Sequence, residues 1–232
     1  MHSAEEPRQN RVLAALPAQD YERLLPGLEP VTMPPEWTIH ESGNRVEYVY
    51  FPTTSVVSLL RPMQDGNAVG VAVVGNEGMV GVSSFLGDAS ACTRAVVQNG
   101  GSGFRLAVHS LQKEFRAGGA LQRMALRYTQ ALLTQMAQTA ICYRFHSPDQ
   151  QLCRWLLLSL DRISGIELAL PRERIAGMLG QHGETAGELQ ASGRIRYAHG
   201  CITVPDRRKL EQLGCECYGV IRSESNRLLQ YH

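Results

Sequence analysis

Hydrophobic and polar positions change their period along the chain. Between Val31 and Val108, short runs rich in Val, Tyr, Thr and Ile are separated by glycine turns, and Val46, Tyr48 and Tyr50 fall on alternate positions. Alternation with a period of two is typical of half-buried strands. Several short strands at regular intervals predict a small antiparallel barrel or jelly roll. Before this region, leucines at helical spacing between prolines predict short N-terminal helices.

The period then changes to that of a helix. Residues 120–145 form 26 positions without Gly or Pro, which predicts a rod about 39 Å long. A shorter helix would be enough to cover one face of a barrel of this size, so we expect this helix to pair with a second copy of the chain. The alternative is that it packs only on its own barrel. The expected interface consists of Leu121, Met124, Tyr128, Ala131, Leu132, Gln135 and Thr139.

A second, mostly helical domain is predicted after Phe145. Ser147, Pro148 and Gln150 have the spacing of a capping box at the start of a new helix. The expected fold is therefore α+β, with three parts. They are a sensor β-roll domain with short N-terminal helices (residues 1–118), a long dimerisation helix (119–145) and a winged helix-turn-helix domain (146–232).

The winged helix-turn-helix follows from the pattern between residues 171 and 206. A short amphipathic segment ends at Gly180, a second helix is expected over 181–192, and two strands follow around the turn at Ala198, His199 and Gly200. The positions expected to face the core are Leu189, Ile195, Tyr197, Ile202 and Val204. Helix, turn, helix and wing is a common arrangement for docking on DNA.

The charge balance gives this domain little attraction for phosphate. The whole chain has a net charge of +1, and the part after Phe145 holds 11 basic and 10 acidic residues. A DNA-binding domain usually shows a local basic surplus, because phosphate contacts supply much of its affinity. The missing surplus counts mildly against DNA binding.

Candidate chemistry is sparse. Six cysteines show no C-x-x-C pair, which favours a reducing cytoplasm, and no apolar run is long enough to span a membrane. No catalytic residues and no metal site are expected. A zinc site from His199, Cys201, Cys215 and Cys217 is disfavoured, since residues two apart on a helix point about 200° away from each other.

The order and spacing of several segments resemble the Crp/Fnr family of bacterial transcription regulators from Leu13 to Leu229. The matching segments are EYVYFPTTSVVSLL (47–60), GNEGMVGVSSFLG (75–87), TRAVVQ (93–98), LRYTQALLTQMAQTAICYRFHSPDQQLCRWLL (126–157), RIAGMLG (174–180), ELQASGRIRY (188–197) and ITVPDRRKLEQLGCECY (202–218). The resemblance implies a sensor β-roll of the cyclic-nucleotide-binding type, a homodimer formed through the long helix, and a winged helix-turn-helix that binds double-stranded DNA.

In the expected β-roll, the loop around Val82 differs from the corresponding loop of relatives that bind cyclic nucleotides. Those proteins hold ribose and phosphate with a Glu and an Arg, where this chain has Val82 and, nearest the Arg position, Cys92; Arg94 lies two residues further on. A cyclic nucleotide is therefore not expected, and the effector is an unknown small molecule. The absence of cysteine before Cys92 also argues against the family's iron–sulfur cluster. The expected effector pocket consists of Gly78, Met79, Val80, Gly81, Val82, Ser83 and Arg94.

The predicted recognition helix, residues 181–192, also differs from that of the family. The stretch from Gly180 to Gln190 is about four residues shorter than in the family, and four residues turn a helix by about 400°, so the faces beyond the gap stay nearly in register. Of the residues with which the family reads DNA bases, only Glu184 remains. Its carboxylate is suited to accept a hydrogen bond from N4 of cytosine. The residues expected to contact DNA are Arg172, Gln181, His182, Glu184, Thr185, Arg194 and Arg196.

Two functional hypotheses follow. The first is a cytoplasmic, non-enzymatic transcription regulator that binds DNA weakly or with relaxed sequence preference. The second is a sensor or interaction protein that has lost DNA reading and acts by forming a heterodimer with a related regulator.

Overall fold

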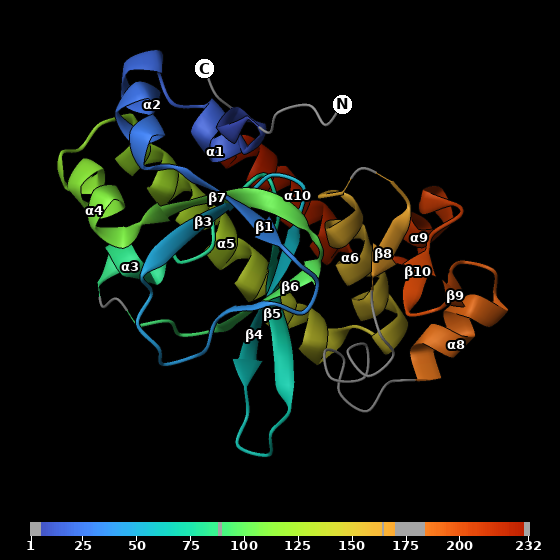
Figure 1. Ribbon diagram of the computed structural model, residues 1–232. Coiled ribbons are helices and arrows are strands. Elements are labelled where there is room, and N and C mark those ends of the chain that lie inside the picture. Colours follow the sequence, from blue (N-terminus) through green and yellow to red (C-terminus); the bar gives the residue numbers. More distant parts are fainter. Residues whose placement is uncertain (1–5, 88–89, 164, 170–183, 230–232) are drawn as a thin grey trace.

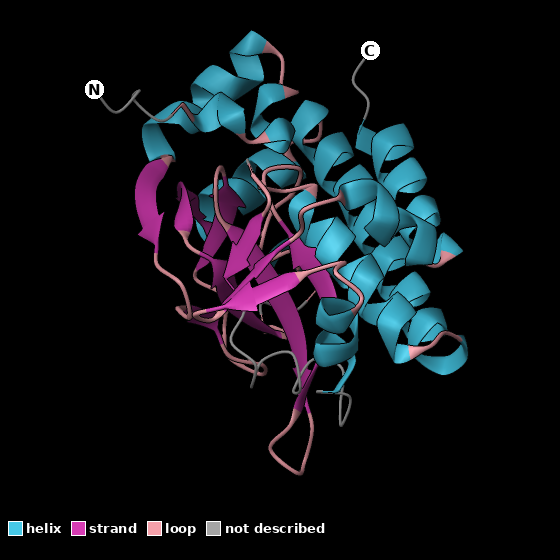
Figure 2. Cartoon of the chain, turned by 90° about the vertical axis from the view of Figure 1, so that its right-hand side faces the viewer, coloured by secondary structure: helices cyan, strands magenta, loops and turns pink. Residues whose placement is uncertain are grey.

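The computed structural model describes residues 6–87, 90–163, 165–169 and 184–229, and the side chains of Glu184 and Thr185 are excepted. Within these residues the chain forms strands on one side and a layer of helices on the other, with one hairpin projecting from the strands (Figures 1 and 2). The α+β class with antiparallel N-terminal sheets is confirmed.

Two antiparallel sheets form the β-roll. The first has the order β1 (Glu29–Met33), β7 (Gly101–Ala107) and β3 (Tyr48–Pro52). The second has the order β2 (Thr38–His40), β6 (Arg94–Asn99), β4 (Val56–Pro62) and β5 (Ala68–Val74). Alternate side chains from both sheets fill the space between them, among them Phe51, Val57, Val97 and Leu106, all at most 1% exposed. The positions between them are also buried over most of β3, β4 and β6. Val56 of β4 and Val73 of β5, for example, lie in the core of the C-terminal domain, so burial does not alternate strictly along these strands.

Short helices close the ends of the roll. They are η1 (Pro7–Gln9), α1 (Arg11–Ala14), α2 (Ala18–Leu24), η2 (Leu25–Gly27), α3 (Ser83–Leu86) and α4 (Val108–Arg116). Asn10 caps α1 by accepting from the backbone N–H of Val12, and its amide donates to the carbonyl oxygens of Pro52 and Gly78 at 2.9 and 2.8 Å. One buried side chain thus fixes the N-terminal helices to the end of β3 and to the loop after β5.

The long helix α5 (Ala120–Phe145) spans the expected residues. The seven side chains expected at a dimer interface lie on its inner face instead. Leu121, Met124, Tyr128, Ala131, Leu132, Gln135 and Thr139 are all at most 8% exposed in the single chain. Four of them belong to the same apolar core as the β-roll, and the Gln135 amide donates to the carbonyl oxygen of Val73 at 3.0 Å. The expected stripe is therefore an intramolecular packing face.

The C-terminal domain begins with α6 (Pro148–Leu160), where the predicted capping box of Ser147 and Gln150 is confirmed. Its other described elements are β8 (Glu167–Ala169), α8 (Glu184–Ala191), β9 (Arg196–Ala198), β10 (Cys201–Thr203), α9 (Arg207–Leu213) and α10 (Glu216–Leu229). The wing is a sheet of order β8-β10-β9, so one strand joins the two that were predicted. The expected first helix, near residues 171–180, lies outside the described residues.

The last helix, α10, returns to the sensor domain. It packs along α5, and its terminal Leu229 lies in the apolar core of the β-roll together with Val12 and Leu13 (Figure 1). The helix is therefore shared between the two parts of the molecule. Among the described residues, no helix is both long and apolar enough to cross a membrane.

Candidate functional site

The sensor and C-terminal parts meet at residues 75–78, Gly-Asn-Glu-Gly, which we call the junction loop. The Glu77 carboxylate accepts a hydrogen bond of 2.7 Å from Nε of Arg162, which follows α6. These side chains are only 12% and 8% exposed. A buried pair of this kind is costly to break, because removing one partner leaves the other charge unpaired. The pair therefore holds the two parts in one relative position.

Both glycines of the junction loop allow close approach. A Cβ at Gly75 would lie 2.7 Å from the Arg162 Cβ, and one at Gly78 would lie 2.2 Å from the Tyr128 ring on α5. Neither contact is possible for a residue with a side chain unless something shifts. The glycines of this loop therefore serve packing of the sensor against α5 and the C-terminal domain.

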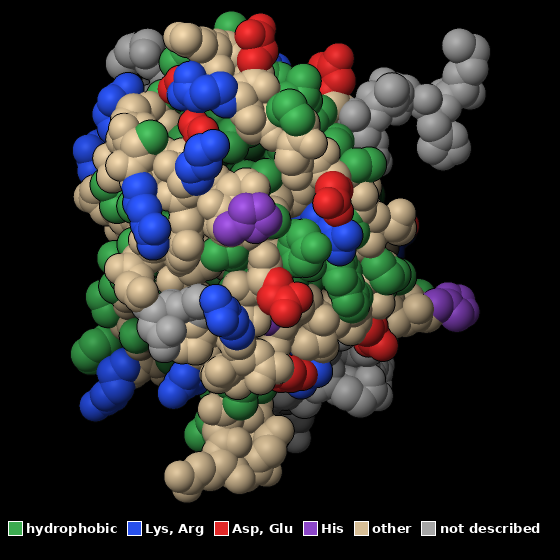
Figure 3. All heavy atoms as spheres, turned by 60° about the vertical axis from the view of Figure 1, so that its left-hand side comes forward, with side chains coloured by type: hydrophobic (Ala, Val, Ile, Leu, Met, Phe, Trp, Pro, Cys, Tyr) green, Lys and Arg blue, Asp and Glu red, His purple; other side chains and the backbone are tan. Residues whose placement is uncertain are grey.

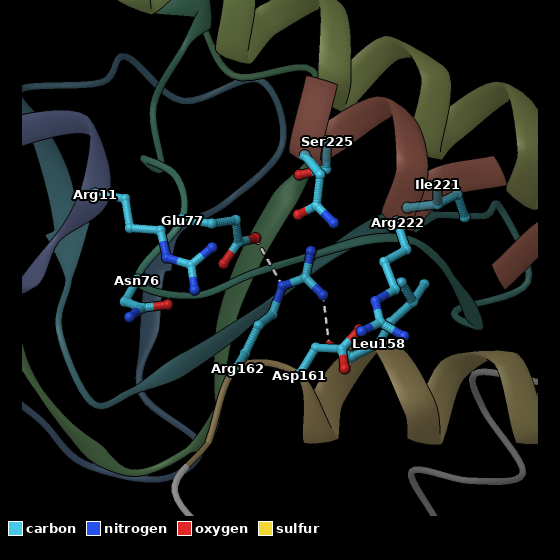
Figure 4. Close-up of a pocket in the computed structure, with 10 residues that line it drawn as sticks. Arg11, Asn76, Glu77, Leu158, Asp161, Arg162, Ile221, Arg222 and Ser225 are labelled. Carbon is cyan, nitrogen blue, oxygen red and sulfur yellow. Dashed lines mark hydrogen bonds and ion pairs between the residues drawn. The ribbon is translucent and has the colours of Figure 1, made fainter. Parts of the chain in front are cut away.

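A cleft of about 260 Å³ opens beside this contact, and we call it the junction cleft (Figure 4). Its lining includes Arg11 of α1, Asn76 and Glu77 of the loop, Arg162, and Arg222 of α10. Figure 4 shows the Arg162 guanidinium in the middle of the cleft, with Arg11 and Arg222 on opposite sides. Among the described residues, neither Arg11 nor Arg222 forms an ion pair. The lining thus holds three arginines and two carboxylates, those of Glu77 and Asp161, and Arg222 also donates a hydrogen bond to the Tyr218 hydroxyl at 3.5 Å.

The residues of the expected effector pocket do not line this cleft. Gly78, Met79, Val80 and Gly81 are buried, and Val82 and Ser83 are half-buried at the start of α3. Gly81 adopts a φ of +105°, which favours glycine. The turn is therefore shaped by packing and backbone conformation.

Arg94, the seventh residue of that expected pocket, is engaged at the edge of the roll. Its Nη2 donates to Thr38 Oγ1 at 3.1 Å, and its Nε lies 3.3 Å from a carboxylate oxygen of Glu41. Thr38 lies in β2, which pairs with β6, and Glu41 directly follows that strand. A ligand that used this guanidinium would have to replace the contact with Glu41.

The described part of the C-terminal domain has a well-defined wing. His199 and Gly200 both have positive φ, 51° and 76°, which is the geometry of a two-residue hairpin turn. Leu189, Ile195, Ile202 and Val204 are buried in one cluster, and Tyr197 packs against it, as the sequence predicted. Of the residues expected to contact DNA, Arg196 is exposed on β9 and Arg194 is half-buried before it.

The other expected DNA contacts are not described at the side-chain level. Arg172, Gln181 and His182 lie outside the described residues, and Glu184 and Thr185 are placed only as the first turn of α8. The sole basic run, 207–209, begins with Arg207, which is ion-paired with Asp161 and Glu211. On the face drawn in Figure 3, basic and acidic side chains are interspersed with hydrophobic ones.

Four potential metal ligands meet where α5 ends and α10 begins, although the sequence predicted no metal site. The ligand atoms of Cys142, His146, Cys215 and Cys217 all lie within 4.8 Å of one another. We call this group the Cys-His cluster. Of the four residues considered for zinc from the sequence, only Cys215 and Cys217 belong to this cluster. Cys215 precedes the helix, whose first residue is Glu216, so the argument from opposite helix faces does not apply to this pair. The signal that was missed is the spacing of Cys142 and His146, one helical turn apart.

The thiols of the cluster share a proton. The Cys142 and Cys215 sulfurs are 3.6 Å apart. The hydrogen bond from the Cys142 thiol, helped by the backbone N–H of Cys217, holds the pKa of Cys215 at about 5. The same hydrogen bond and burial raise the pKa of Cys142. Both shifts favour the proton on Cys142 over Cys215, and the deprotonated thiolate is the form of cysteine that binds metals.

Solved structures with the same fold are Crp/Fnr-type regulators. A protein described as a Crp/Fnr-family transcriptional regulator from Eubacterium rectale superposes with a TM-score of 0.68 at 14% identity, covering 87% of this chain and 96% of its own. FixK2 from Bradyrhizobium japonicum gives 0.65 at 18% identity, covering 81% and 98%. The c-di-GMP responsive global regulator CLP of Xanthomonas campestris gives 0.64 at 16% identity, covering 81% and 99%.

At the level of sequence, no protein-family model and no curated protein matches the chain. The likeness to the solved structures is therefore one of fold, and it extends from the β-roll through the long helix to the C-terminal domain.

Proposed function

We propose that the protein is a non-enzymatic, cytoplasmic transcription regulator of the Crp/Fnr type, which acts as a homodimer on double-stranded DNA. The observation that carries the proposal is the fold, shared over most of the chain with regulators of this family. The wing, with Arg196 exposed on β9, supports a role in DNA docking.

The dimer forms through the outer face of α5. Leu126, Leu133, Ile141 and Phe145 are between 44% and 73% exposed on that face. With Gln130 and Ala137 they recur at intervals of three or four residues, which is the spacing of a helix-pairing stripe. A second copy of the same helix is the partner that this self-complementary, two-fold arrangement favours.

Signal input occurs at the sensor and reaches the C-terminal domain through the junction loop. The guanidinium groups of Arg11 and Arg222, which form no ion pair among the described residues, favour a small anion as the effector, bound in the junction cleft. Because α1, the loop and α10 all line this cleft, an anion there would change the balance between two domain positions.

The test is selection of bound fragments from a random DNA pool at low salt. It compares the wild type with a variant in which four residues are restored after Thr185. Enrichment of a two-fold site by the wild type would support a regulator that reads DNA with its short helix. Enrichment by the restored variant alone would favour the alternative, a partner protein that forms heterodimers with an intact relative.

Substitution of the wing arginine checks the docking surface. Arg196→Ala is expected to weaken binding similarly for all sequences and to reduce the salt dependence by about one phosphate contact. Arg116→Ala, an exposed arginine of α4 in the sensor domain, is the matched control and should leave both quantities unchanged. Equal effects of the two substitutions would contradict docking through the wing.

A further inference from the structure

We propose that Cys142, His146, Cys215 and Cys217 bind one zinc ion, which fixes the end of the long helix α5 to the start of the last helix α10. Nothing in the proposed regulatory function requires this site. Metal content can also be measured without any DNA, so the two proposals can fail separately.

Two distances in the cluster match the edges of a tetrahedral site. Zinc binds sulfur at about 2.3 Å, so two ligand atoms on one tetrahedral edge lie about 3.8 Å apart. The Cys142 and Cys215 sulfurs are 3.6 Å apart, and the Cys217 sulfur lies 3.6 Å from Nδ1 of His146. These two contacts involve all four residues and correspond to two opposite edges. Three thiolates and one imidazole form a ligand set typical of structural zinc.

Local backbone structure places the ligands. Cys142 and His146 are one helical turn apart at the end of α5, and the His146 N–H donates to the Cys142 carbonyl oxygen at 3.0 Å. Cys215 stands before α10 and Cys217 lies in its first turn. The positive end of the helix dipole favours thiolates at this position.

The histidine is oriented for metal binding. Its Nδ1 faces the Cys217 sulfur, while its Nε2 lies 3.2 Å from a carboxylate oxygen of Glu216. A histidine that binds metal usually donates its other ring N–H to a carboxylate or carbonyl, which fixes the tautomer. The Gln151 amide donates to the His146 carbonyl oxygen at 2.8 Å and holds the backbone here.

A buried arginine supplies the compensating charge. Zinc with three thiolates carries a net charge of −1, and the guanidinium group of Arg154, only 3% exposed, lies beside Cys142. Among the described residues, no carboxylate pairs with Arg154; its Nη1 donates to Thr139 at 3.0 Å. A buried cation needs a countercharge, and the metal–thiolate group provides it.

The site is closed, as structural zinc sites are. Cys142 and Cys217 are fully buried and Cys215 is 7% exposed, so four protein ligands leave no open position for a substrate. Cys142 and Cys215 are 73 residues apart in sequence, and nearly all of the C-terminal domain lies between them. One ion would therefore join the end of α5, where that domain begins, to the start of the domain's last helix.

A disulfide between Cys142 and Cys215 is the competing interpretation. Their 3.6 Å separation is well beyond the S–S bond of about 2.05 Å. A disulfide would also give no role to the contacts that His146 makes with Cys217 and Glu216. It would provide no countercharge for Arg154. The test is designed to detect it.

The first experiment measures zinc in full-length protein purified under reducing conditions, by elemental mass spectrometry. We expect about one zinc per chain, and less than about a tenth of that in Cys142→Ser and Cys217→Ser. Cys153→Ser, also buried but outside the cluster, and Cys92→Ser, which is exposed, are the controls and should retain the metal. His146→Cys should retain zinc where His146→Ala loses it.

The second experiment remains decisive if a serine variant fails to fold. Wild-type protein is stripped with a chelator and titrated with Co²⁺, which should give the visible bands of tetrahedral cobalt and sulfur-to-cobalt charge transfer, both abolished by zinc. Folded wild type that gives neither band and holds no zinc would overturn the proposal. A Cys142–Cys215 disulfide found by peptide mass spectrometry in that reduced protein would overturn it as well.

Discussion

At the residue scale, Gly78 shows how one missing side chain permits a domain contact. The Tyr128 ring occupies the space where a Cβ would lie, at 2.2 Å, and Tyr128 is itself 3% exposed in the core. The glycine is therefore required by packing on α5.

We predict that Gly78→Ala lowers the free energy of unfolding by about 1–3 kcal/mol, because overpacking a core displaces side chains or backbone. The control is Gly219→Ala on the exposed side of α10, where a Cβ would meet nothing within 4 Å. That change should raise stability by up to about 1 kcal/mol, since alanine favours helix. Urea unfolding of both variants checks the opposite signs; equal effects would refute the packing argument.

At the scale of the element, α5 is apolar on two opposite faces. The inner face packs on the β-roll and includes Gln135 and Thr139 among its buried positions, while the outer face presents Leu126 and Leu133. Residues 133 and 135 differ by about 200° around a helix, so the two stripes are distinct. A helix with both stripes can cover its own domain and still pair with a second copy.

We predict that Leu133→Glu converts the dimer to monomer, since a helix pair would bury two like charges close to its two-fold axis. Leu86→Glu on α3 is the control, because Leu86 is also about half exposed at 51% but lies on another element. Light scattering after size exclusion reports the mass, and circular dichroism reports folding. A wild type that is monomeric at micromolar concentration would count against dimerisation through α5.

At the scale of the whole molecule, the contacts that join the C-terminal domain to the sensor domain and α5 include three of different chemical kinds. They are the Glu77–Arg162 pair, the packing of α10 along α5, and the Cys-His cluster. All three fix the same interface at different points, so the fold has a defined domain position instead of two freely linked parts. A regulator needs such contacts, because a signal can shift only an equilibrium between defined positions.

We predict that Glu77→Gln and Arg162→Gln each separate thermal unfolding into two transitions, since each loosens the domain junction. A double-mutant cycle should give a coupling energy of about 1–3 kcal/mol, because the two side chains are in direct contact and largely buried. Arg227→Gln is the control: its ion pair with Glu224 is within α10, and the arginine side chain is 62% exposed. Additive effects of the two junction substitutions would contradict the pair's role.

The sequence by itself determined the elements whose cause is local. The capping box at Ser147, the bounds of α5 and the hairpin turn at His199 and Gly200 depend on residues close together in the chain, so period and turn chemistry were sufficient. The order of segments was also enough to indicate the Crp/Fnr fold.

Only the tertiary structure decided which contacts these elements make. The period of α5 shows an apolar stripe but not its partner, so the predicted dimer interface proved to be the face against the β-roll. The roles of Gly75 and Gly78 depend on Arg162 and Tyr128, which are distant in sequence. The Cys-His cluster unites residues of two helices 73 positions apart, and nothing local to either helix encodes their proximity, because it follows from the packing of α10 on α5.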